Sequence, residues 1–367
     1  MSAPGLRVIA PGPLATVQDL GRPGYQRYGV SGSGAMDPYA LALGNLLVGN
    51  RPGAAAVEIT LGGAEFEFLR DTPFAVTGAD LGATLAGAAV TMWQTMRAAP
   101  GDRLAFAGPV AGMRAYLCVA GGIDTPPALG SRATHVGSRL GGLEGRALQA
   151  GDELPLGEPP PAPPPRRVPR ALVPACGNDV TLRVVRGPQE HAFTPEGIRT
   201  FYESTYTLTD RSDRMGARLD GPVIEAAGGR YDIVSDAVPT GSVQVPGDGK
   251  PIVLLADRQT TGGYAKIAVV AAVDLPLIAQ AAPGAAIRFR PVGVEEAEDA
   301  AAERLALLDA VRFESAASGP AYSLVVNGAV YAVALPAPGP VAAGERRTLV
   351  VRVNERTLRV GVERLEG

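Results

Sequence analysis

Residues Pro251 to Val270 read PIVLLADRQTTGGYAKIAVV. The apolar run Ile252–Leu255 is typical of a buried strand, and it leads directly into a polar loop with two glycines, Asp257–Tyr264. Similar punctuation recurs along the whole chain, which has 47 glycines and 33 prolines in 367 residues. Because these residues end helices and strands early, the sequence predicts many short strands in a sandwich or barrel. Further strands are expected at residues 7–9, 65–69, 115–119 and 181–185.

The composition limits the classes of protein to consider. Hydrophobic residues make up 46% of the chain and the net charge is only -3, as in globular proteins. No basic block or basic-aromatic stripe is present, which argues against nucleic acid as a partner. The sequence shows neither a signal peptide nor a membrane-spanning run, so we expect a cytoplasmic protein.

The stretch Gly157–Arg170, GEPPPAPPPRRVPR, divides the chain. Successive prolines remove backbone donors and fix φ, so neither a helix nor a central strand is expected, and a stiff connector is. We therefore expect the following units: a β lobe at 1–156, the connector at 157–170, a β-barrel lobe at 171–293, a helix at 294–312 and a small β appendage at 313–367.

Helical signals are few. In Met36–Val48, Asp37 is a good N-cap and Pro38 is favoured at the first helical position. Val294–Val311 is rich in alanine and acidic in its first turn, which predicts a surface helix. In the appendage, Asn327-Gly328 between two apolar runs indicates a hairpin.

Three polar, glycine-bearing loops are candidates for a ligand site, since such loops allow close approach to the backbone. The first, Thr16–Asp37, joins Gln18, Asp19 and Arg22 to a Gly-Ser-Gly turn whose amides could receive an anion. Taken alone, such a turn more often serves as a plain turn and helix cap.

The second loop, Asp210–Gly216, alternates two aspartates with two arginines. An arginine fork can hold a carboxylate through two hydrogen bonds, although an ion pair that fixes the loop is equally consistent with the pattern. The third loop, Asp257–Tyr264, supplies hydroxyl, amide and phenol groups at the end of a strand.

Other chemistries find little support. Cys118 and Cys176 have no metal-ligand spacing and are too few for a disulfide framework, so no metal site is predicted. His135 and His191 lie in no triad pattern. Neither lysine, Lys250 or Lys266, stands in a phosphate-binding loop motif, so ATP would need another arrangement.

Several motifs together resemble a family of carboxyltransferase-like proteins, that of the 5-oxoprolinase C subunits, also known as allophanate hydrolase subunit 2. In order along the chain they are residues 17–25 (VQDLGRPGY), 34–37 (GAMD), 45–50 (NLLVGN), 121–123 (GGI), 130–134 (GSRAT), 212–216 (SDRMG), 219–222 (LDGP), 244–246 (QVP) and 251–270. The motifs extend over roughly residues 5–292, and the appendage lies outside them.

The resemblance implies a mainly β chain with two cyclophilin-like β-barrel lobes. It further implies a complex with the A subunit and the smaller, homologous B subunit of 5-oxoprolinase, which together convert 5-oxoproline, water and ATP to glutamate. The chain would then be one component of an ATP-hydrolysing enzyme and inactive without its partners.

Related sequences leave two other functions open. One is the carboxyltransferase part of a biotin-dependent urea carboxylase, and the other is a regulatory binding protein without catalysis. Biotin is attached to a lysine, and no lysine follows Lys266. The C-terminal appendage is therefore not expected to carry biotin, although a partner could.

We predict that twelve residues, eleven from these loops together with Gln244, converge on one polar cleft. Expected to bind substrate are Gln18, Asp19, Arg22, Asp37, Arg211, Gln244 and Tyr264, and expected to act catalytically are Asp213, Arg214, Gln259, Thr260 and Thr261. In this hypothesis Arg214 or Arg22 orients the substrate carboxylate. Asp213 holds an arginine or acts as base, and the Gln259–Thr261 segment polarises the lactam oxygen.

Overall fold

The computed structural model describes residues 3–161, 163–316, 321–326, 329–334, 346–353 and 356–363. The chain divides into two compact units, one of residues 1–163 and 167–313 and one of residues 164–166 and 314–367. The larger unit holds both predicted lobes. No helix in the described ranges has the length and apolarity needed to cross a membrane.

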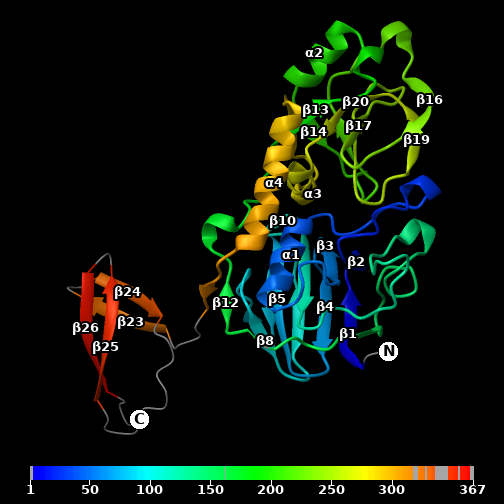
Figure 1. Ribbon diagram of the computed structural model, residues 1–367. Coiled ribbons are helices and arrows are strands. Elements are labelled where there is room, and N and C mark those ends of the chain that lie inside the picture. Colours follow the sequence, from blue (N-terminus) through cyan, green and yellow to red (C-terminus); the bar gives the residue numbers. More distant parts are fainter. Residues whose placement is uncertain are drawn as a thin grey trace. The chain divides into compact units, whose positions relative to one another are not determined.

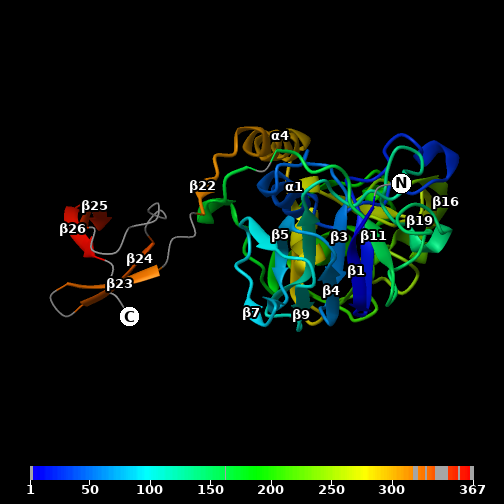
Figure 2. The same cartoon turned by 90° about the horizontal axis from the view of Figure 1, so that it is seen from below.

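The first lobe consists of two antiparallel sheets around one core (Figure 2). Strand β4 shows why they form, because Phe66 and Phe68 are buried while Glu65 and Glu67 are partly exposed, the alternation of a half-buried strand. One sheet has the order β11 (Glu153–Pro155), β1 (Pro4–Pro11), β4 (Ala64–Phe68), β9 (Arg103–Phe106), β6 (Ala83–Leu85) and β7 (Ala88–Ala89). The other has the order β2 (Leu14–Gln18), β3 (Ala56–Thr60), β10 (Ala111–Val119), β5 (Thr72–Asp80) and β8 (Met96–Ala98).

Helix α1 (Pro38–Leu47) covers the second sheet and packs on β5 and β10. Asp37 caps it as the sequence predicts, since its Oδ1 accepts a hydrogen bond from the Ala40 amide at 3.0 Å. The side of the helix toward the sheet is apolar and forms a further buried cluster with the sheet.

The second lobe is a closed seven-stranded barrel (Figure 1). Its strands follow the order β13 (Asp179–Arg186), β20 (Lys266–Val270), β17 (Ser242–Gln244), β18 (Ile252–Leu254), β15 (Gly216–Asp220), β14 (Tyr206–Leu208) and β21 (Ala286–Pro291). Inward-facing Leu182, Val184, Val243 and Ile267 are fully buried in its core. The mainly β fold with few helices is therefore confirmed, with one closed barrel and one pair of sheets.

Other elements complete the lobes. Helices α2 (Pro195–Glu203) and α3 (Leu275–Gln280) were not predicted, whereas α4 (Val294–Ala310) forms where the alanine-rich stretch predicts a helix. Outside the barrel, β16 (Asp232–Ala237) pairs with β19 (Thr261–Tyr264) in a two-stranded ribbon. Single 3-10 turns lie at Gln26–Tyr28, Val136–Ser138, Arg170–Leu172, Glu190–Ala192, Ala227–Gly229 and Ala272–Asp274, and β12 (Arg166–Arg167) and β22 (Glu314–Ser315) are two-residue strands.

The smaller unit contains two antiparallel hairpins. One pairs β23 (Ala321–Val326) with β24 (Ala329–Ala334), and the other pairs β25 (Arg346–Val353) with β26 (Arg356–Glu363). The predicted Asn327-Gly328 turn lies outside the described residues. The appendage is thus β-structured, as the sequence indicates.

Candidate functional site between the lobes

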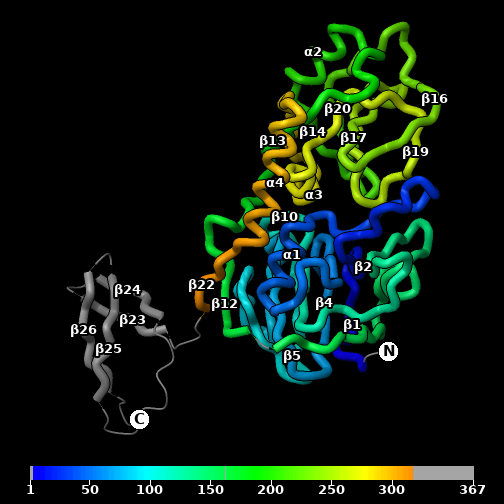
Figure 3. Tube along the Cα trace, in the orientation of Figure 1, coloured from blue at the N-terminus to red at the C-terminus, as the bar shows by residue number. Residues whose placement is uncertain are grey.

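The first and third polar loops meet where the two lobes of the larger unit contact each other (Figure 3). This contact between the lobes, which includes Ser33 and Asp257, is called the seam. Ser33 donates from Oγ to Asp257 Oδ1 at 2.6 Å, and its amide donates to Ala256 O at 3.1 Å. Farther along, Gln26 Nε2 donates to Val238 O at 3.1 Å and Gln26 Oε1 accepts from Arg258 Nη2 at 3.0 Å. Two of the three predicted loops are therefore in direct contact.

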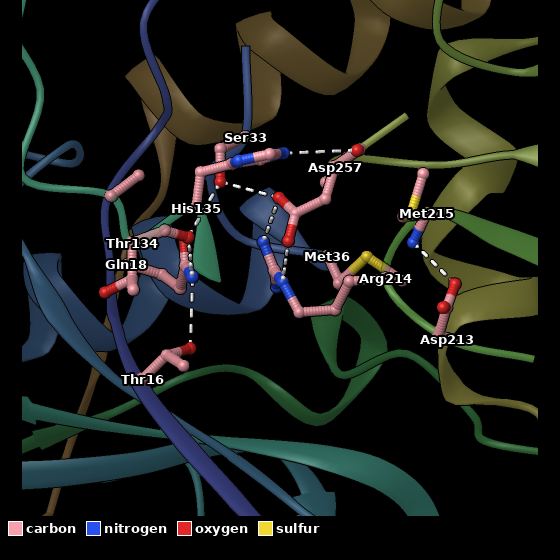
Figure 4. Close-up of polar contacts among 12 residues, drawn as sticks. Thr16, Gln18, Ser33, Met36, Thr134, His135, Asp213, Arg214, Met215 and Asp257 are labelled. Atoms are coloured by element: carbon pink, nitrogen blue, oxygen red, sulfur yellow. Dashed lines mark hydrogen bonds and ion pairs between the residues drawn. The ribbon is translucent and has the colours of Figure 1, made fainter. Parts of the chain in front are cut away.

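Arg214, from the second loop, lies at the centre of this seam (Figure 4). Its Nε donates to Asp257 Oδ2 at 2.8 Å, its Nη1 pairs with Glu58 Oε1, and its Nη2 donates to Gly34 O at 2.7 Å. Glu58 lies on β3 of the first lobe, so one buried guanidinium bonds both lobes. Burial alone would lower the pKa of Arg214, but the charges of Glu58 and Asp257 raise it above its ordinary value.

The polar network continues from Glu58 into the first lobe. Glu58 Oε2 accepts from the Met36 amide at 2.9 Å and from Tyr116 Oη at 2.8 Å. Burial and the nearby Glu58 charge raise the pKa of Tyr116 well above its usual range. The same phenol oxygen accepts from the Asp37 amide at 2.7 Å, which positions the start of α1.

Asp37 carries the network across the seam a second time. Its Oδ2 accepts from Gln280 Nε2 at 3.1 Å, and Gln280, on α3 of the second lobe, accepts from the Arg114 amide at 2.9 Å. Burial raises the pKa of Asp37 although the Ala40 amide and Gln280 oppose the shift. The residue therefore joins the lobes through its carboxylate.

The predicted residues Gln18, Asp19 and Arg22 gather around residues 131–134 of the first lobe. Asp19 accepts from Gly21 N at 2.8 Å, Ser131 Oγ at 2.6 Å and Arg132 N at 2.6 Å. Gln18 Nε2 donates to Thr134 O at 3.0 Å, and Arg22 Nη2 bonds Ala133 O. Gln18 Oε1 and Arg22 Nη1 are buried with no hydrogen-bond partner among the described residues. Burial lowers the pKa of Arg22, which Asp19 and Asp257 partly offset.

Two glycines let this loop fold back tightly on itself. Gly21 and Gly34 have φ of +84° and +98°, a region that favours glycine. A Cβ on Gly34 would lie 2.8 Å from the Gly21 nitrogen. The tight fold of the loop brings Ser33 against Asp257.

The predicted residues of the third loop form a separate group beside the barrel. Gln244 Nε2 donates to Tyr264 O at 3.3 Å, and Gln259 Nε2 reaches Gln244 Oε1 only at 3.4 Å. Thr260 offers its carbonyl to the Val238 amide at 3.0 Å, while Gln259 and Thr261 are exposed. Because these amide contacts are long, the carboxamides of Gln244 and Gln259 are weakly held.

Arg211 and Asp213 lie on the exposed side of the second loop. Asp213 Oδ1 accepts from the amides of Met215 at 2.8 Å and Gly216 at 3.1 Å, so it closes its own turn. Figure 4 shows Asp213 turned away from the Asp257 carboxylate, which forms an ion pair with Arg214. The twelve residues are thus distributed over the seam, the 131–134 cluster, the barrel side and this outer loop, and their convergence and chemical roles stay predictions.

A cavity of about 230 Å³ lies between the lobes, lined by Asp37, Trp93, Cys176, Leu277 and Gln280 among others. A second cavity, of about 420 Å³, lies between α1 and α4 and is lined by Tyr39, Leu305 and neighbouring residues. Of the twelve predicted residues, only Asp37 lines either of these cavities. Within the described ranges no group of three metal-ligating side chains is present.

Cys176 provides a test of how closed the first cavity is. Burial, with a smaller effect of the Asp37 charge, raises the pKa of this thiol to about 11. Because the thiolate is the nucleophile, alkylation by iodoacetamide should be slow at neutral pH and rise about tenfold per pH unit up to roughly pH 10. Mass spectrometry of the native chain, with Cys176→Ser as control, measures this rate. A rate that levels off below about pH 9 would show that the thiol is ordinary.

Sequence reasoning missed the residues that connect the seam. Glu58 and Asp257 hold Arg214, and neither was singled out as a site residue. The available signal was a carboxylate inside the apolar strand Ala56–Thr60, AVEIT. Lys266, also missed, is a lone lysine within an apolar run and is fully buried.

Comparisons with known proteins agree with this architecture. Residues 28–291 match the family model described as "Carboxyltransferase domain, subdomain A and B". The 5-oxoprolinase C subunit of Escherichia coli (strain K12) is 42% identical over 298 residues, which cover 80% of this chain and 93% of the relative. Its counterpart in Haemophilus influenzae (strain ATCC 51907 / DSM 11121 / KW20 / Rd) is 39% identical over 301 residues, covering 81% and 94%.

A larger enzyme shares the same fold. The crystal structure of the K. lactis urea amidolyase superimposes with a TM-score of 0.81 at 32% identity, covering 86% of this chain and 20% of that one. This chain therefore spans about a fifth of the urea amidolyase it matches.

Proposed function

Because the chain belongs to the family described as "Carboxyltransferase domain, subdomain A and B", and 5-oxoprolinase C subunits are among its relatives, we propose that it is a component of an ATP-dependent 5-oxoprolinase. The complex, which also contains an A and a B component, hydrolyses 5-oxo-L-proline to L-glutamate. The observation that carries the proposal is 42% identity over 93% of the Escherichia coli relative.

The proposed chemistry needs groups that polarise an amide. Water adds to the lactam carbonyl carbon, the ring C–N bond breaks, and ATP hydrolysis drives the opening. Carboxamide N–H and hydroxyl groups can stabilise the developing oxyanion, and we assign this role to Gln259, Thr260 and Thr261. We also assign Gln244, whose Oε1 lies 3.4 Å from Gln259 Nε2, to the residues that bind the substrate. The chain has no lysine-bearing phosphate loop, so we assign ATP to the complex rather than to a motif of this chain.

A biotin-dependent carboxyltransferase acting on urea is the second candidate, favoured by the similarity to the urea amidolyase. In that case a partner would supply carboxybiotin. Covalent biotin does not fit this chain's own C-terminal unit, because biotin is joined to a lysine amine and residues 267–367 contain no lysine.

Copurification with A-like and B-like partners, followed by an ATP hydrolysis assay, tests the proposed function. We expect ATP hydrolysis that depends on 5-oxo-L-proline and on the partners, with no response to urea. The chain alone should be inactive. Hydrolysis stimulated by urea in the presence of a biotinylated partner would instead support the second candidate and reject the first.

A further inference from the structure

The outer face of the barrel carries a buried polar pair. Gln244 on β17 lies opposite Lys266 on β20, and opposed residues of an antiparallel pair project to the same side of the sheet. Their chain neighbours Val243, Ala265 and Ile267 point into the barrel core. Gln244 and Lys266 point outward, since Gln244 Nε2 lies beside Gly262 and Lys266 Nζ bonds Asp236, both of which belong to strands outside the barrel.

The two-stranded ribbon of β16 and β19 covers this face. Figure 1 shows it along the outer side of β17 and β20. Gly262 of the ribbon approaches so closely that a Cβ there would lie 2.8 Å from Gln244 Nε2. Under this cover the Lys266 side chain is only 1% exposed, whereas Val234 on the ribbon is 92% exposed. The β16–β19 pairing is interrupted by a register shift between Asp232 and Asp236.

Three donors converge on the carboxylate of Asp236, which belongs to the ribbon. Lys266 Nζ lies 3.0 Å and Gln189 Nε2 3.1 Å from its Oδ2, and the Ala237 amide donates to its Oδ1 at 2.7 Å. Asp236 is itself 49% exposed. The Lys266 ammonium and the Gln189 carboxamide thus donate to the same carboxylate oxygen, and hydrogen bonds between charged groups are the strong ones.

We propose that Lys266 and Gln189 bind the carboxylate of the substrate, and that Asp236 occupies this site until the substrate displaces it. The identity of the ligand as 5-oxo-L-proline rests on the proposed function, whereas the site for a small carboxylate does not. Gln244 lies opposite Lys266, and Gln259 is adjacent to Gln244, so carboxamide groups lie on the same face as the Lys266 ammonium.

The geometry favours Lys266 over the arginines for this role. Arg214 bonds two buried carboxylates, so freeing it means separating the lobes. The group to be displaced from Lys266 is a half-exposed aspartate, which Gln189 and the Ala237 amide also hold. Lys250 pairs with the exposed Asp220 at 3.1 Å in the same lobe but is itself partly exposed, which makes it a matched control.

The test measures the affinity of the full complex, without ATP, for 5-oxo-L-proline, acetate and 2-pyrrolidinone by isothermal titration calorimetry. 2-Pyrrolidinone has the lactam but lacks the carboxylate. We expect Lys266→Met to lower the affinity for 5-oxo-L-proline about 10- to 100-fold and to leave the affinity for 2-pyrrolidinone unchanged. Asp236→Asn should raise the affinity for both carboxylate ligands, 5-oxo-L-proline and acetate. Lys266→Arg should recover part of the affinity that Lys266→Met loses, and Lys250→Met should leave the affinities unchanged. Thermal melts confirm that each variant is folded.

The outcomes separate this inference from the proposed function. If the complex hydrolyses 5-oxo-L-proline while Lys266→Met binds it as tightly as the wild type, the carboxylate site is wrong and the function stands. If the complex never acts on 5-oxo-L-proline but Asp236→Asn strengthens acetate binding through Lys266, the site stands and the function is wrong. Absence of carboxylate binding in both the wild type and Asp236→Asn overturns the site.

Discussion

Replacing Arg214 by alanine is expected to lower the free energy of unfolding by about 3–5 kcal/mol. The substitution leaves two buried carboxylates, Glu58 and Asp257, without the guanidinium that forms an ion pair with each of them. It also removes the hydrogen bond to Gly34 O, so the contact between the lobes is weakened at its centre. Burial of a charge without a partner is among the costliest changes in a folded protein.

Urea denaturation followed by far-UV circular dichroism measures this loss of stability. Arg211→Ala is the matched control, because it removes an exposed arginine from the same loop and should change the free energy by less than about 0.5 kcal/mol. Glu58→Gln combined with Arg214→Met should be less destabilised than the sum of the single changes, since the two side chains interact directly. Equal stability of Arg214→Ala and Arg211→Ala would contradict the central role of Arg214 in the seam.

Replacing Gln259 by alanine in the reconstituted complex is expected to lower kcat for 5-oxo-L-proline about 100-fold, the effect of losing one donor to an oxyanion. Gln259 is exposed and its side-chain hydrogen bond to Gln244 is long, so the stability of the chain should be preserved. Steady-state glutamate formation gives kcat and KM separately. A fall in kcat with little change in KM is expected for an interaction made mainly in the transition state.

Gln149→Ala provides the control, because it also removes an exposed glutamine, but from the first lobe instead of the second. It should leave both kinetic constants unchanged. If Gln259→Ala retained full kcat, the oxyanion role of this segment would be excluded.

The mainly β fold was predictable because it is encoded locally. Alternating residues such as those of β4 and the Asp37-Pro38 start of α1 specify their structure within a few positions. Helix α3 escaped prediction because Leu275–Gln280 is short and apolar, and a strand would show the same pattern. Its place is fixed by Gln280, which bonds across the seam.

The site was less predictable because tertiary packing decides which side chains face each other. Asp213 and Arg214 are adjacent in sequence, yet one is exposed and closes a turn while the other is buried between the lobes. Glu58 alternates with apolar neighbours like any surface residue of a strand, yet Met36 and Tyr116 of the first lobe and Arg214 of the second lobe all bond its carboxylate. Local pattern also does not predict the hydrogen bonds from Ser33 to Asp257 and from Gln26 to Val238, because the partners lie more than two hundred positions apart in the sequence.

Formation of glutamate from 5-oxo-L-proline and ATP, measured with each component of the complex left out in turn, is the decisive measurement for the proposed function. We expect glutamate only when this chain, its A-like and B-like partners and ATP are all present. The same rate of glutamate formation in a mixture that lacks this chain would contradict the proposal.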